Sequence, residues 1–270
     1  MRTTYSASVT VRILCAVAVL LATLGAFYGS GVLGGTPIAE AAGGRLGADS
    51  TLLAPGTGAF SIWSFIYTAL LVYAAWQVSA KAGESRAQRK MRPWAAASAV
   101  LNALWIGTVQ LGWLGLSVLV ILLLLAVLVR IFLLLIPVAE SAVERWITAV
   151  AFGPYLGWVS VATVANIAAW LSSFGLGEGA AWTIPLAILL LVVAALIGAG
   201  TVHFSGGRIS AALAMAWGIA WIGVGRSDGG LESAPVAIAA FCAAGLLVVY
   251  AVLAALQRRV RFNRGAENTA

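Results

Sequence analysis

Charged residues are scarce in this sequence. Asp, Glu, Lys and Arg make up only 9% of the 270 residues, whereas hydrophobic residues make up 62%. A soluble domain carries about a quarter charged residues, so this supply could not cover a water-exposed surface. The net charge of +7 would suggest nucleic-acid binding in a soluble protein. Because the basic residues lie between apolar runs, we expect no nucleic-acid partner and predict an all-α membrane protein.

Cysteine and histidine are also rare, which limits the chemistry available. Cys15 and Cys242 lie inside apolar runs, and the single histidine, His203, has no other metal-ligating residue near it in sequence. The apolar runs hold almost no ionisable residues, and Arg130 is placed where its side chain can reach the headgroups. No Ser-His-acid set, carboxylate pair or phosphate-binding glycine loop is visible. We therefore predict no catalytic residues and no metal site, and we favour a binding protein over an enzyme.

Long apolar runs are abundant, and each predicts a membrane-spanning helix. About 20 apolar residues cross the hydrocarbon core, and only a helix satisfies its own backbone there. By this criterion we predict a helical bundle of about eight spans. The predicted spans are 13–30, 58–80, 93–112, 113–129, 146–170, 180–202, 209–225 and 234–256.

The positions of Lys and Arg predict the orientation of the chain, because basic loops remain cytoplasmic. With both termini inside, only Arg45 and Arg226 fall on the outer side. The predicted inner residues are Arg2, Arg12, Lys81, Arg86, Arg89, Lys90, Arg92, Arg130, Arg145, Arg208, Arg258, Arg259, Arg261 and Arg264. We therefore expect a multi-pass cell-membrane protein with cytoplasmic N- and C-termini and the lipid bilayer as its first partner.

Tryptophan is unusually abundant, with 11 residues in the chain. One group falls at predicted span ends, as expected for an aromatic belt at the headgroups. That group is Trp76, Trp94, Trp113, Trp146, Trp170 and Trp182. The remaining tryptophans lie deeper, where an indole N–H needs a partner and the ring offers a flat apolar wall. They are Trp63, Trp105, Trp158, Trp217 and Trp221.

Three predicted spans bring such rings together with polar side chains at a similar depth. In the span 146–170, residues four apart share one helix face, which places Trp158 in line with an asparagine and Tyr155 beside them. An outer loop at 31–57 lies above this zone and suits a movable cover. The predicted ligand-binding residues are Trp63, Tyr67, Asn102, Trp105, Tyr155, Trp158, Ala162 and Asn166. Packing between helices is the alternative explanation for any one of them.

At these same residues the chain resembles the translocator protein family, also called tryptophan-rich sensory proteins (TspO/MBR). The matching strings are FSIWSFIY at 60–67, LNALW at 101–105 and PYLGWVSVATVANIAAW at 154–170. The resemblance covers roughly residues 11 to 171 and implies a five-helix core. It divides the chain into a core at 1–171 and a three-helix region with a basic tail at 172–270.

The resemblance implies a function as well as a fold. Family members are similar in binding porphyrins and related flat ligands between their helices, beneath the first loop. We therefore expect a membrane-embedded receptor or sensor for a hydrophobic, porphyrin- or haem-like ligand, with no covalently held cofactor. The alternatives are a channel or carrier for such solutes and an enzyme that degrades porphyrins. Small residues in the last two predicted spans suit a homodimer, and they suit packing within one chain equally well.

Overall fold

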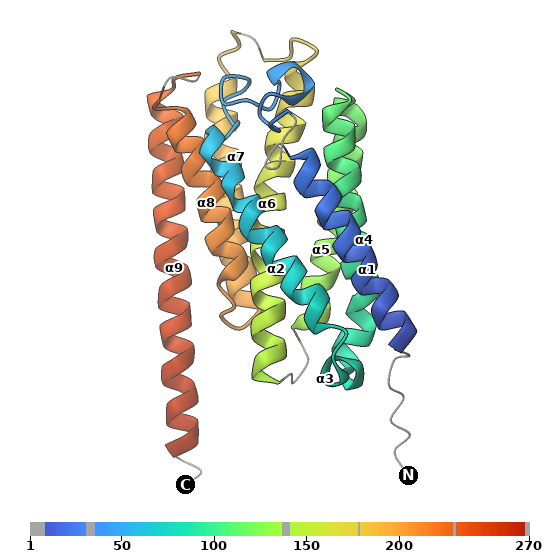
Figure 1. The fold of residues 1–270 in the computed structure, drawn as a ribbon. Coiled ribbons are helices and arrows are strands. Elements are labelled where there is room, and N and C mark those ends of the chain that lie inside the picture. The colour runs from blue at the N-terminus through green and yellow to red at the C-terminus, as the bar shows by residue number, and fades with distance from the viewer. Residues whose placement is uncertain (1–8, 31–35, 137–140, 178, 229–230, 268–270) are drawn as a thin grey trace, which may run out of the picture.

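The computed structural model describes residues 9–30, 36–136, 141–177, 179–228 and 231–267, and these form a bundle of helices with no strand among them (Figure 1). The all-α fold predicted from composition is confirmed. The elements are α1 Val9–Gly29, η1 Ala41–Gly44, η2 Thr57–Ser61, α2 Ile62–Trp76, α3 Ala80–Glu84, α4 Arg86–Gln110, α5 Leu114–Leu135, α6 Ala142–Ser172, α7 Thr183–Phe204, α8 Ser210–Gly225 and α9 Ala234–Glu267.

Each predicted span has a long helix at its position. Six helical segments are long and apolar enough to cross a membrane on those grounds alone, namely α1, η2 with α2, α5, α6, α7 and α9. Helix α8 is shorter, with 16 residues. Helix α4 begins with a basic stretch, Arg86 to Arg92, which lowers its apolar content. The chain is an integral membrane protein, and helices α4 and α8 pack within the same bundle.

Several helices extend beyond the predicted boundaries. Helix α4 begins seven residues before Pro93 because the Ser85 side chain accepts a hydrogen bond from Gln88 N and caps it. Helix α5 continues past Arg130 to Leu135. Helix α7 ends at Phe204, so His203 lies in its last turn and not in a loop, as the sequence had suggested. Helix α9 has 34 residues, about 50 Å at 1.5 Å per residue, and projects beyond the rest of the bundle (Figure 1).

The two ends of the bundle differ. The start of α1, the linker with α3 and the end of α9 lie at one end, here called the basic end (Figure 1). The described part of the first loop, residues 36–56, covers the opposite end, here called the loop end. Two glycines and Ala42 in the turn at η1 adopt positive φ, which lets this loop fold back on itself.

Two apolar clusters fill the bundle. The first core consists mainly of buried residues from α1, α2, α4, α5 and α6. Ile38, Ala41 and Leu46 of the first loop, Ala59 of η2 and Ala211 of α8 complete it. The second core consists of buried residues from α7, α8 and α9, joined by Val161 of α6 and Leu53 of the first loop. Helix α6 therefore contributes to both cores.

Close packing of α8 on α6 connects the two cores. A Cβ atom at Gly157 of α6 would lie 2.1 Å from the Ala211 carbonyl oxygen, and one at Gly153 would lie 1.9 Å from Ser210 Oγ. On the α8 side, a Cβ atom at Gly218 would lie 3.0 Å from Val161. Small residues on both α6 and α8 thus bring two helices of one chain together. This contact lies within one chain, and the homodimer stays a prediction.

Buried arginines hold the linker at the basic end. Arg12 of α1 donates from Nη1 to the carbonyl oxygens of Val78 and Ser79 at 3.0 and 2.8 Å. Arg92 of α4 donates to the carbonyl of Ala82. Both side chains are buried, so a charge from each of two helices is satisfied in part by the backbone between α2 and α4. The linker is thereby fixed against the ends of α1 and α4.

Candidate ligand-binding site

The predicted ligand-binding residues converge at the loop-end half of the first core. Trp63 and Tyr67 lie on α2, Asn102 and Trp105 lie on α4, and the remaining four lie on α6. All are buried except Ala162, which is partly buried and packs against the same core. The structure thus brings together three helices that are well separated in the sequence, as the aromatic and amide pattern predicted. Whether these residues bind a ligand remains a prediction.

Trp63 is the centre of the aromatic contacts. Its ring stacks on Tyr67 with centroids 5.1 Å apart and lies 6.0 Å from both Trp105 and Tyr155. It also meets Trp158 edge-to-face at 6.3 Å. Phe60 of η2 adds an edge contact to Trp158 at 5.8 Å. We call these rings the aromatic cluster: Phe60, Trp63, Tyr67, Trp105, Tyr155 and Trp158.

Hydrogen bonds between helices fix the orientation of most of these side chains. Asn102 Nδ2 donates to the Tyr67 hydroxyl at 3.1 Å, which joins α4 to α2. Trp105 Nε1 donates to Asn166 Oδ1 at 2.8 Å, and Asn166 Nδ2 donates to Ser117 Oγ of α5 at 2.9 Å. The amide of Asn166 therefore links α4, α5 and α6.

The Tyr155 hydroxyl makes the remaining link of this kind. It donates to the Ser98 carbonyl oxygen at 2.9 Å and so joins α6 to α4. Polar groups at this depth must bond to protein or ligand, since lipid offers no partner. The paired amides and hydroxyls are satisfied by neighbouring helices, which accounts for their places in the sequence without any ligand.

Three buried polar atoms in this region are left unpaired, two of the aromatic cluster and one of Asn102 beside it. Within the described residues, Trp63 Nε1, Trp158 Nε1 and Asn102 Oδ1 have no hydrogen-bond partner. Trp63 and Trp158 are each only 1% exposed, so their N–H groups are fully removed from the surface. Leaving such groups unpaired costs about 1 to 3 kcal/mol each. The aromatic cluster therefore has two unpaired indole N–H donors beside its flat apolar rings, and Asn102 adds one unpaired carbonyl acceptor.

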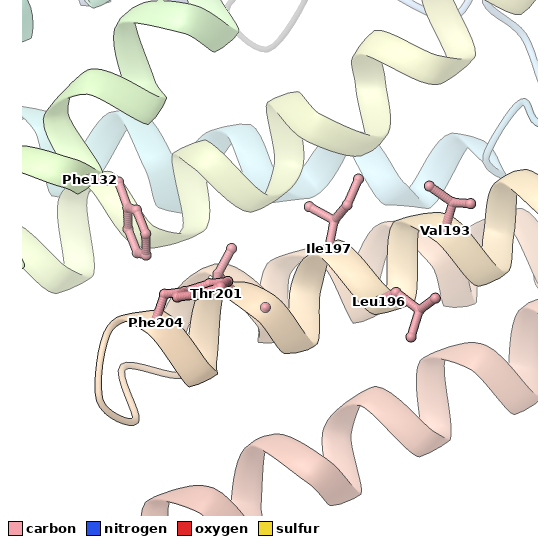
Figure 2. Close-up of a pocket in the computed structure, with 7 residues that line it drawn as sticks. Phe132, Val193, Leu196, Ile197, Thr201 and Phe204 are labelled. Carbon is pink, nitrogen blue, oxygen red and sulfur yellow. The ribbon is translucent and has the colours of Figure 1, made fainter.

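The aromatic cluster is closed in this structure, because its rings contact one another. Two open grooves lie elsewhere on the described part of the bundle. One groove of about 460 Å³ lies between α5 and α7, where Phe132 faces the α7 side chains that include Thr201 and Phe204 (Figure 2). The other lies between α2 and α6 and is lined by residues such as Val72 and Trp146. Both are almost entirely apolar, and neither is lined by a residue predicted to bind ligand.

The two deep tryptophans of α8 have a different role from those of the aromatic cluster. Trp217 and Trp221 contact each other edge-to-face at 5.6 Å. Trp217 is 40% exposed and donates from Nε1 to the Ala59 carbonyl oxygen at 3.2 Å, while Trp221 packs over Gly58. They form an interface with the segment that precedes α2, and not a second set of buried walls.

Sequence reasoning missed three residues at this end of the bundle. Ser117 completes the hydrogen-bond link to α5, and Phe60 extends the aromatic cluster. Arg226, placed by sequence among the outer basic residues, is 1% exposed and donates to backbone carbonyls of the first loop. Phe60 was visible in the FSIW string that carried the resemblance. Serine and arginine partners of backbone or amide groups have no periodic signal that would have identified them.

The described residues also contain no group of three or more His, Cys, Asp or Glu side chains able to hold a metal ion. The cysteines are unpaired, with Cys15 partly buried and Cys242 exposed. The chemical resources of the site are therefore aromatic faces, indole N–H groups, amides and hydroxyls. These suit recognition of a flat apolar molecule with a few polar substituents.

Comparison with known proteins assigns the family. A family model described as TSPO-like protein matches residues 12–253. Neither a curated protein nor a solved structure gives a match. The matched range begins in α1, takes in the aromatic cluster and all of α7 and α8, and ends within α9. The boundary predicted at residue 171 thus lies inside the match, and the division into two regions stays a prediction. The chain belongs to the TSPO-like protein family.

Proposed function

We propose that this protein is a membrane-embedded receptor or sensor that binds a flat, hydrophobic, porphyrin-like ligand at the aromatic cluster. One observation carries the proposal: Trp63 sits among four other aromatic rings on three helices, and its buried indole N–H has no partner among the described residues. The unpaired Trp158 Nε1 lies beside it. A porphyrin has a flat apolar face and carboxylate substituents, which are complementary to ring walls and N–H donors.

Binding in this cluster requires the rings to separate. The edge contacts of Trp158 with Trp63 and Phe60 close the side nearest to η2, so ligand entry would part these three rings. Each aromatic contact contributes about 0.5 to 1.5 kcal/mol beyond its buried area, a cost that ligand stacking can replace. The unpaired atoms favour the opened state further, because a ligand would supply the partners they lack.

Tryptophan fluorescence tests the proposal directly. Titration of the full chain in lipid nanodiscs with protoporphyrin IX is expected to give saturable quenching. Trp158→Phe keeps the ring shape but removes the unpaired N–H and should weaken the apparent affinity. Trp146→Phe is the matched control, because Trp146 is 71% exposed at the start of α6. Non-saturable quenching, or equal affinities for both variants and the parent chain, would remove the ligand claim.

Flux measurements separate the receptor from the carrier alternative. In sealed liposomes that contain the protein, a receptor is expected to bind a fluorescent porphyrin without accelerating its passage across the bilayer. Protein-dependent flux that saturates would instead establish a carrier. Decay of the porphyrin spectrum under illumination, dependent on Trp63 and Trp158, would establish degradation.

We place the basic end of the bundle in the cytoplasm. The described Lys and Arg residues lie at that end except for Arg45 and Arg226, whereas Arg2 and the side chains of Arg259, Arg261 and Arg264 lie outside the described residues. In a background without Cys15 and Cys242, Arg45→Cys should react with an impermeant thiol reagent added outside cells. Lys81→Cys should react only after permeabilisation. The reverse pattern would invert the topology. The homodimer stays a prediction, which chemical cross-linking of the protein in the same membranes would test.

A further inference from the structure

We infer that the C-terminal helices control access to the aromatic cluster by holding the first loop closed, with Arg226 as the main positioning residue. The effect on ligand exchange rests on the proposed function, whereas the hold on the loop stands on its own contacts. A set of interactions, here called the clamp, joins Trp217 and Trp221 of α8 and the following Arg226 to residues 48–59.

Arg226 provides the charged part of this clamp. It follows the last turn of α8 and is 1% exposed. Its Nη1 donates to the Thr51 carbonyl oxygen at 2.7 Å, and its Nη2 donates to the Ala48 carbonyl. A buried guanidinium is stable only where such acceptors surround it, and bonds from a charged donor are stronger than neutral ones. One side chain thus binds two carbonyl oxygens of the loop that lie three residues apart.

Backbone and ring contacts continue the clamp toward α2. Gly56 N donates to the Trp221 carbonyl oxygen at 2.8 Å. A Cβ atom at Gly58 would lie 2.2 Å from the Trp221 ring, so the loop needs glycine there to pass beneath the indole. Trp217 Nε1 donates to the Ala59 carbonyl oxygen. Every one of these contacts comes from α8.

The clamped segment leads directly into the aromatic cluster. Ala59 is fully buried, and the next residue, Phe60, makes the edge contact to Trp158. Trp63 follows one turn later in α2. Because Phe60 must move for Trp158 and Trp63 to part, a hold on residues 56–59 also restrains opening of the cluster.

Helix α8 can act as a fixed support because it is packed tightly on α6. The glycine contacts at Gly153, Gly157 and Gly218 leave no space between the two helices. Helix α6 carries Trp158 itself. The loop is therefore fastened to the same rigid unit that forms one wall of the cluster, and movement of the loop relative to α8 is equivalent to movement relative to that wall.

The hold on the loop is tested by hydrogen exchange without any ligand. Arg226→Met keeps much of the side-chain volume and removes every donor. We expect amide exchange across residues 48–59 to rise roughly tenfold or more, with the exchange of α5 unchanged. Arg45→Met, an exposed arginine of the same loop, is the matched control and should leave exchange as in the parent chain. Unchanged exchange in Arg226→Met would overturn the clamp.

Ligand kinetics test the control of access. With protoporphyrin IX as the probe, stopped-flow quenching of Arg226→Met should show association and dissociation both accelerated by about the same factor as exchange, with the dissociation constant changed less. A loosened loop with unchanged porphyrin kinetics would overturn access control. Absence of saturable quenching in the parent chain would instead defeat the proposed function and leave the exchange result standing.

Milder variants keep the inference testable if Arg226→Met does not fold. Arg226→Lys retains the charge with fewer donors and should raise loop exchange by a smaller factor than Met. Trp217→Phe removes only the bond to Ala59 and should raise exchange at 56–59 while leaving that at 48–51 unchanged. Amide exchange equal to that of the parent chain in both Arg226→Lys and Trp217→Phe would contradict the inference.

Discussion

The two cores of the bundle are packed by different chemistry. The first core carries large aromatic rings and hydrogen bonds that run between helices, such as Trp105 to Asn166 and Asn102 to Tyr67. The second core is built from Ala, Leu, Ile, Val and Met, and the hydroxyls of Thr183, Thr201 and Ser205 bond to carbonyls of nearby residues in their own segments. Close packing of small and branched residues gives a rigid support. Directional bonds and unpaired N–H groups in the first core give a surface suited to recognition.

The largest expected effect comes from removing the ring at the centre of the first core. Trp63→Leu deletes the ring that contacts four others, and we expect saturable protoporphyrin quenching to be lost together with about 3 kcal/mol of stability. Titration and thermal unfolding in the same nanodiscs measure both. Trp182→Leu, at an exposed site before α7, should change neither, and parent-like binding by Trp63→Leu would remove the distinction between the cores.

A matched change in the second core should separate stability from binding. Leu191→Ala on α7 opens a cavity at a side chain that is 1% exposed. Since the helices unfold within lipid and not into water, the cost is mainly lost packing, about 2 kcal/mol. Thermal unfolding should therefore shift downward while the protoporphyrin affinity stays that of the parent chain. A large loss of affinity would mean that the second core also shapes the site.

The link between α4, α5 and α6 should give a smaller effect. Asn166→Leu leaves Trp105 Nε1 buried without an acceptor, and a hydrogen bond between membrane helices contributes about 1 kcal/mol. Trp105→Phe removes that donor, so the double variant should be more stable than the sum of the single changes predicts. Thermal unfolding of the four chains gives the coupling. Strict additivity would show that the bond contributes nothing to the first core.

The smallest expected effect is at a helix position without neighbours. Among the described residues, no atom outside the helix's own adjacent backbone lies within 4 Å of a Cβ atom built at Gly245 of α9. Gly245→Ala should therefore stabilise the helix by less than about 1 kcal/mol. The same change at Gly157, where the Ala211 carbonyl blocks the Cβ atom, should destabilise the protein. Equal unfolding temperatures for the two variants would contradict the close packing of α8 on α6.

Apolar length predicted the helices, and four-residue spacing with a shared depth along the helices predicted that Trp63, Trp105 and Asn166 would lie together. Both predictions follow from the regular geometry of a helix. Helix ends were harder to place. Capping by Ser85 allows α4 to begin well before Pro93, and this depends on one side chain. The closure of the aromatic cluster could not be predicted either, because ring packing depends on side-chain directions and helix distances that composition does not encode.

The contacts of Arg226 with the first loop could not be predicted from the sequence for a different reason. Its partners are backbone carbonyls, which every residue has, so nothing at Ala48 or Thr51 marks them as acceptors. The only local signals were glycines at 56 and 58, which are common in loops. Charge counting placed Arg226 correctly among the residues of the loop end but treated it as a topology marker. Its burial became evident only when α8 and the first loop were seen together.

Helix α9 starts at Ala234, shortly after Arg226, and its ladder of peptide hydrogen bonds continues to Glu267. That span of about 50 Å exceeds the roughly 30 Å of membrane hydrocarbon, so its final turns stand in water on the basic side. A fluorophore or affinity tag fused after this helix would be separated from Trp63 by most of the bilayer thickness, because Trp63 lies in the loop-end half of the bundle. Purification tags and energy-transfer acceptors can therefore be attached there without obstructing the porphyrin titrations.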